Sequence, residues 1–95
     1  MKVQLHCEYT DVALAHDENE AQLFRKEIDG KEIELEFMPA IGDNITLFTK
    51  RGWVEGTVSI RGAGHAFEGA PVKPELAGKT WYGIWFGELT IMEHY

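Results

Sequence analysis

The chain has few of the residues on which nucleophilic and redox chemistry depend. It contains one cysteine, Cys7, and one serine, Ser59. A single cysteine cannot form an internal disulfide, so nothing implies export to an oxidising compartment. Cys7 falls on the apolar side of an alternating segment, which predicts a buried thiol, and Ser59 lacks the flanking glycines of a nucleophile elbow. We therefore assign no catalytic residue, expect no cofactor and favour a non-enzymatic protein.

Long apolar runs are also absent. The first residues contain no apolar stretch of the kind found in a signal peptide. The longest nearly uninterrupted apolar stretch covers residues 81–87, which is far too short to cross a bilayer as a helix. We expect a cytoplasmic protein without membrane association, and the 95 residues are the size of one domain, 1–95.

Positive charge is scarce in the first half of the chain. Between Lys2 and Arg25 there is no lysine or arginine, and residues 1–50 carry eleven acids against five bases, within a total net charge of −7. Binding to a nucleic-acid backbone requires cationic side chains, so we expect no nucleic-acid partner. An acidic surface suits solubility or a basic protein partner.

Phosphate-binding and metal-binding motifs are incomplete. Gly78-Lys79-Thr80 matches only the end of a phosphate loop, since the position five residues before Gly78 holds Lys73 and an aromatic, strand-like segment follows, so a turn before a strand is predicted. No two histidines stand at i, i+2 or i+4. No metal site is predicted, although distant segments could bring two or three of the four histidines together. They are His6, His16, His65 and His94.

Alternating apolar and polar residues predict a mostly β fold. The first strand starts at Lys2 and points Val3, Leu5, Cys7 and Tyr9 inward. The next covers 31–37 and points Ile33, Leu35 and Phe37 inward. Two later strands have as inward residues Ile45 and Leu47, and then Val54, Val58 and Ile60. The last two strands cover 81–86 and 88–92, with Gly87 at a bend, bulge or turn. The number and spacing of strands favour a small antiparallel barrel or a two-sheet sandwich with at most one or two short helical turns. An SH3-like barrel is compatible with this count but implies no function.

Residues 18–28 fit two local structures. Asp17 could cap a helix that runs to Ile28, with Ala21, Phe24 and Ile28 on one face. The alternative is a hairpin around Asp29-Gly30, which would pair Phe24 with Leu35 and place opposite charges on the other face. We favour the hairpin.

The segment from Gly62 to Lys79 is rich in glycine, alanine and proline and predicts a long connection with one helical turn near Pro74. Arg61 and His65 flank its first glycines, so these two side chains are candidate polar groups of a pocket beneath the connection.

Residues 81–86 are apolar on both faces of any strand, so one face needs cover other than the core. The 62–80 loop, a second protein chain, or a flat ligand stacked on the rings could supply it. The candidate platform for a ligand or partner consists of Trp81, Tyr82, Trp85 and Phe86. We expect a small acidic interaction module that binds a protein partner or a second copy of itself. The alternative is a small-molecule-binding or enzymatic barrel with its pocket under the 62–80 loop.

Overall fold

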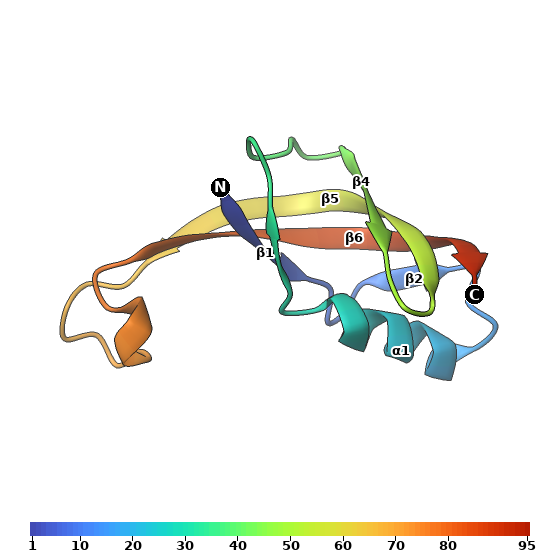
Figure 1. Ribbon diagram of the computed structural model, residues 1–95, viewed down its shortest axis with the longest axis horizontal. Coiled ribbons are helices and arrows are strands. Elements are labelled where there is room, and N and C mark those ends of the chain that lie inside the picture. The colour runs from blue at the N-terminus through green and yellow to red at the C-terminus, as the bar shows by residue number, and fades with distance from the viewer.

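The computed structural model describes residues 1–95 and is mostly β, with one substantial helix (Figure 1). In chain order the elements are β1 (Lys2–His6), β2 (Asp11–Ala13), α1 (Glu18–Ile28), β3 (Glu32–Glu34), β4 (Asn44–Phe48), β5 (Gly52–His65), the 3-10 turn η1 (Pro74–Leu76) and β6 (Thr80–His94). No helix is long and apolar enough to cross a membrane.

All six strands form one curved sheet that stays open. The order is β3-β1-β6-β5-β4, and β2 pairs with β6 beyond the end of β1. The predicted antiparallel barrel or two-sheet sandwich is wrong in two respects, because β1 and β2 run parallel to β6 and the edge strands β3 and β4 do not pair. The connection between these edges bonds to β5 instead, where Gly42 donates to the Val58 carbonyl and Val58 donates to the Asp43 carbonyl. A seam therefore separates β3 from β4.

The centre of the sheet is one long hairpin of β5 and β6. The two predicted final strands are a single strand. Its pairing with β5 skips Gly87, between Thr57↔Glu88 and Val58↔Phe86, and Met92, between Val54↔Ile91 and Trp53↔Glu93. On β5 a third irregularity leaves Ser59 unpaired, which turns Ile60 out to solvent rather than into the core as predicted. Strand β5 also continues through Gly62 to His65, so the irregular connection is shorter than predicted and lies at the far tip of the hairpin (Figure 1).

Residues 18–28 form a helix, so the favoured hairpin is wrong. The Asp17 carboxylate accepts a hydrogen bond from the Glu20 N–H at 2.9 Å, which satisfies one of the free donors of the first turn. At the other end the Asp29 carboxylate accepts from the Cys7 N–H at 2.8 Å, and Gly30 adopts a φ of +79°. Burial decides between the two readings, because helical spacing places Ala21, Phe24 and Ile28 together against the sheet.

Strand β3 is shorter than predicted. It pairs with β1 only over Glu32–Glu34, and the chain bends away before Phe37, which is exposed rather than buried. Strand β1 likewise ends at His6; Cys7 is buried as predicted, but Tyr9 is 90% exposed. Thr10 lies where β1 has ended and β2 has not begun, and its hydroxyl donates to the Phe86 carbonyl at 2.5 Å. The Thr10 hydroxyl thus satisfies a carbonyl group of β6 at the gap between β1 and β2, the two strands that run parallel to β6.

Candidate functional site

The main hollow of the molecule is a cleft between α1 and the seam of the sheet, with a volume of about 860 Å³. This volume is within the range found for small-molecule binding sites. The apolar walls come from β1, α1, β3 and β4. We call it the cleft. Its apolar lining residues are Leu5, Leu23, Ile28, Ile33, Leu47 and Phe48; its polar ones are Lys26, Glu27, Lys31, Thr49, Lys50 and Arg51.

One carboxylate of the helix holds the cleft's two walls together. Glu27 accepts a hydrogen bond from the Lys50 backbone N–H at 2.7 Å, and its other oxygen lies 3.6 Å from the Arg51 side chain. The turn between β4 and β5 is thereby fixed against α1. β3 does not pair with β4, and Ile33 and Leu47 on these two edge strands are only partly buried.

The rim of the cleft is positive although the protein is acidic. Lys26, Lys31, Lys50 and Arg51 face a single acid, Glu27, which gives a local charge of +3 in a chain of net charge −7. Each of the three lysines lacks a salt bridge within 4.0 Å. Unpaired cations around an apolar floor favour a ligand with an apolar body and an anionic head.

The predicted aromatic platform is divided between the two faces of the sheet. Phe86 is buried in the core and Tyr82 packs against it, so only Trp81 and Trp85 face outward. Trp81 lies on the backbone of Gly64, where a Cβ atom would be 2.7 Å from the indole. Trp85 stacks on the His6 ring at a centroid distance of 4.3 Å and remains 40% exposed. The connection between β5 and β6 lies at the projecting tip of their hairpin and does not fold back over the sheet (Figure 1).

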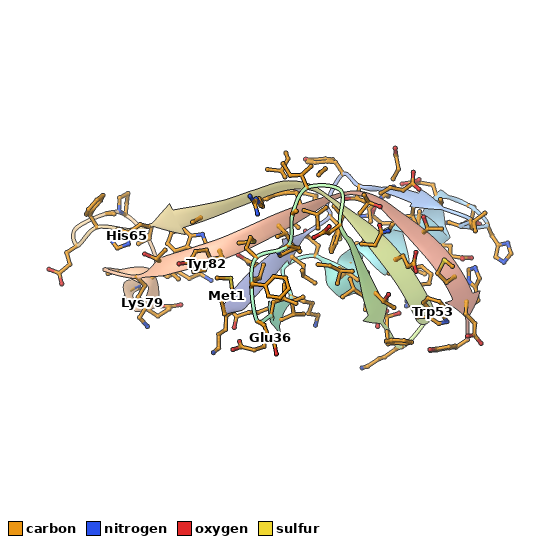
Figure 2. All side chains as sticks on the ribbon, turned by 90° about the horizontal axis from the view of Figure 1, so that it is seen from above. Met1, Glu36, Trp53, His65, Lys79 and Tyr82 are labelled. Atoms are coloured by element: carbon orange, nitrogen blue, oxygen red, sulfur yellow. The ribbon has the colours of Figure 1, made fainter.

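The two candidate polar groups at the base of the loop point to different neighbours. Arg61 donates to the Pro39 carbonyl at 3.2 Å, whereas the His65 ring contacts the Thr80 hydroxyl at 2.8 Å. Figure 2 shows His65 near the projecting end of the molecule, far from Trp53. None of the three main hollows is lined by a residue of 62–80.

Two of the four histidines converge at the opposite end of the molecule. His16 precedes α1, His94 ends β6, and their rings stack at a centroid distance of 5.2 Å. Glu20 lies between them, with one carboxylate oxygen 2.9 Å from His94 Nδ1 and the other 4.0 Å from His16 Nε2. This is a set of metal-ligand side chains that the histidine spacing alone did not indicate. His6 and His65 lie elsewhere: His6 stacks on Trp85, and His65 meets Phe67 in an edge-to-face contact.

Cys7 is not a reactive group. Burial, and secondarily the nearby Asp29 carboxylate, raise the pKa of its thiol to about 12, with Arg25 acting weakly in the opposite direction. Its sulfur lies 3.3 Å from the Arg25 carbonyl oxygen and donates to it. Because the thiolate is the nucleophilic form, this side chain serves packing at neutral pH.

Comparisons with family models, with curated proteins and with solved structures found no match to this chain.

The cleft escaped prediction from the sequence because its cations are dispersed along the chain. Lys26 is on the helix, Lys31 precedes β3, and Lys50 belongs to the turn after β4. One local feature could have indicated the cleft. Lys26 and Lys31 lie on either side of the end of α1, and Leu23, one helical turn before Lys26, is an apolar residue that is exposed. The metal-ligand cluster had a similar signal, since His16 and Glu20 stand at i, i+4.

Proposed function

We propose that the protein is a non-enzymatic binding module that holds a small amphipathic anion in the cleft. The observation that carries the proposal is the set of three lysines without acidic partners around an apolar floor. The ligand class that fits this arrangement is a long-chain carboxylate or a similar molecule with an apolar body and one negative head. The carboxylate would lie among the lysines and the chain would lie along Leu23, Ile33 and Leu47.

The overall negative charge does not oppose this proposal at short range. At physiological ionic strength the Debye length is about 8 Å, so charges farther away are largely screened. An anionic head inside the cleft experiences chiefly the local charge of +3. Glu27 repels the anionic head only weakly, because one of its oxygens accepts from the Lys50 backbone N–H and the other is paired with the Arg51 side chain.

Binding of dodecanoate, measured by titration calorimetry below its micellar concentration, tests the proposal. We expect one site per chain, and binding at least about ten-fold weaker for dodecyltrimethylammonium, whose chain has the same length and whose head is positive. The triple variant Lys26→Gln, Lys31→Gln, Lys50→Gln is expected to lose about ten-fold or more in affinity, since each exposed charge contact contributes up to ~1 kcal/mol.

The chain offers a matched control, because its other three lysines lie outside the cleft. The variant Lys2→Gln, Lys73→Gln, Lys79→Gln carries the same net charge and should bind dodecanoate as the unmodified protein does. Equal losses in the two triple variants would assign the effect to overall charge rather than to the cleft. Equal binding of the two surfactants would overturn the proposal outright.

A second candidate function is self-association, favoured by one observation on the outer face of the sheet. Ile60 and Trp85 are cross-strand neighbours, and they are 57% and 40% exposed. His6 stacks beside them and no member of this patch is acidic. Two copies could therefore meet here without the like-charge repulsion that the rest of an acidic surface imposes.

Light scattering coupled to size-exclusion chromatography tests self-association. We expect a dimer for the unmodified chain and a monomer for Ile60→Lys, because a lysine at a buried dimer contact brings an unpaired charge. Phe48→Lys, at a still more exposed apolar position that lines the cleft, is the matched control and should remain dimeric. A monomer in all three proteins discards this candidate.

A further inference from the structure

Three side chains from the two ends of the chain bring metal-ligand atoms close together. His16 lies in the loop before α1, Glu20 is in the first turn of the helix, and His94 is the last residue of β6. One ligand atom from each lies within 4.8 Å of the others. No residue of this cluster lines the cleft, so the cluster is separate from the function proposed above.

The backbone fixes all three residues independently of any ion. Asp17 caps α1, which sets Glu20 on the turn that faces the sheet and places His16 immediately before the helix. His94 is held by its pairing with Gly52, and the next residue, Tyr95, donates its N–H to the Arg51 carbonyl at 2.9 Å. The site is thus preorganised at its carboxylate and at one imidazole, while the exposed His16 side chain is free to adjust.

The Glu20 carboxylate lies within ion-pair distance of His94 but makes no hydrogen bond with it. Oε1 of Glu20 is buried and has no hydrogen-bond partner, although Nδ1 of His94 is only 2.9 Å away. The imidazole nitrogen is close enough to donate but is not aimed at the oxygen. A buried carboxylate oxygen without a donor is costly, and a cation that both atoms contact would satisfy it.

The spacing suits a small ion with short bonds. With zinc-ligand bonds of 2.0–2.2 Å, neighbouring ligand atoms of a tetrahedral site are separated by about 3.3 Å. The nitrogen and oxygen of His94 and Glu20 are already near this separation. His16 Nε2 lies 4.0 Å from the other carboxylate oxygen, and the three ligand atoms lie within 4.8 Å of one another. His16 must therefore approach by up to about 1.5 Å, which its 80% exposed side chain allows.

We propose that His16, Glu20 and His94 form a binding site for Zn²⁺ with a fourth position open to solvent. Two imidazoles and one carboxylate are a zinc-ligand set, and sites with three protein ligands keep a position for water or another ligand. Glu20 and His94 line a hollow to which Asp17, Asn19, Lys50, Arg51 and Tyr95 also contribute. Binding would link the start of α1 to the end of β6.

The test uses the untagged full chain, freed of metal by a chelator, and zinc chloride alone as the probe. We expect one zinc per chain by competition with a chromogenic chelator, and a visible d–d absorption spectrum when Co²⁺ replaces Zn²⁺. Zinc at about a hundred-fold excess over its Kd should raise Tm by roughly 10 °C for a chain of this size.

Histidine variants inside and outside the cluster provide matched controls. His16→Ala and His94→Ala should each weaken zinc binding at least about ten-fold and reduce the Tm shift by about half or more at the same zinc concentration, whereas His65→Ala should change neither. His16 is so exposed that its removal should leave the metal-free Tm unchanged, which separates loss of binding from loss of folding. The variant Lys26→Gln, Lys31→Gln, which changes two cleft lysines that do not line the hollow beside the cluster, should bind zinc normally, so failure of either proposal is seen independently of the other.

The proposal is overturned if the metal-free chain takes up no zinc, or if His16→Ala binds it as tightly as the unmodified chain. Glu20→Gln, which keeps the side-chain size and removes its charge, adds a check on the carboxylate. If this variant keeps both zinc affinity and the Co²⁺ spectrum, Glu20 is not a ligand and the site as stated is wrong.

Discussion

Gly52→Ala is expected to lower the free energy of unfolding by at least about 3 kcal/mol, through backbone strain and overpacking. A Cβ atom on this residue would lie 1.9 Å from the Glu93 carbonyl oxygen, and the backbone φ of +154° is one that residues with side chains rarely adopt. The clash is with backbone of a central strand, which cannot move like a flexible side chain. Relief would require separating the start of β5 from the end of β6.

Urea denaturation followed by circular dichroism measures this effect. Gly62→Ala is the matched control, because this glycine lies on the same strand, has nothing within 4 Å of its missing Cβ and has no positive φ. We expect Gly62→Ala to stay within about 0.5 kcal/mol of the unmodified chain. If Gly52→Ala is destabilised no more than Gly62→Ala, the close approach between β5 and β6 described above is incorrect.

Phe24→Ala is expected to destabilise the protein by about 3–5 kcal/mol, the range for removing a buried aromatic side chain. Phe24 is 1% exposed and belongs to the core that α1 forms with the sheet. Its ring also meets the edge of the His94 ring, with centroids 6.0 Å apart. The substitution would leave a cavity between the helix and the strands.

Leu23→Ala is the matched control for this substitution. Leu23 is adjacent in the same helix, is 42% exposed and lines the cleft, so its loss should cost less than about 1 kcal/mol. Both changes introduce alanine into α1, so differences in helix propensity nearly cancel. Similar unfolding free energies for the two variants would contradict the helix orientation. Leu23→Ala should also weaken dodecanoate binding, because Leu23 lines the cleft. Phe24→Ala is less suitable for that binding test, because its stability is expected to be low.

Local patterns were informative wherever burial follows a simple period. The inward positions Val3 and Leu5, the strand with Ile45 and Leu47, and the turn before β5 were all predicted from alternation and turn residues. Gly87 was expected at a bend, bulge or turn, and it is unpaired in the middle of β6. Gly78 lies in a turn that leads into β6, and a turn before a strand is what was predicted there in place of a phosphate loop.

The hairpin favoured for residues 18–28 was the largest error, and it arose because two local signals were of similar strength. Asp29-Gly30 is a good hairpin turn and also a good helix end, and the charges of residues 24–35 suited cross-strand pairing. Nothing within that segment decides between them. The burial of Ala21, Phe24 and Ile28 against distant strands decides it, and the Cys7 N–H, which directly follows β1, adds a hydrogen bond to the Asp29 carboxylate.

The sequence by itself determined that the protein is mostly β, where most strands begin, and that its thiol is buried, because period-two alternation and turn residues act between near neighbours. Only the tertiary structure decided the parallel placement of β1 and β2 beside β6, the open seam, the basic cleft and the meeting of His16 with His94. Each of these depends on contacts between residues far apart in the chain, and no local pattern records which distant segments will share a core.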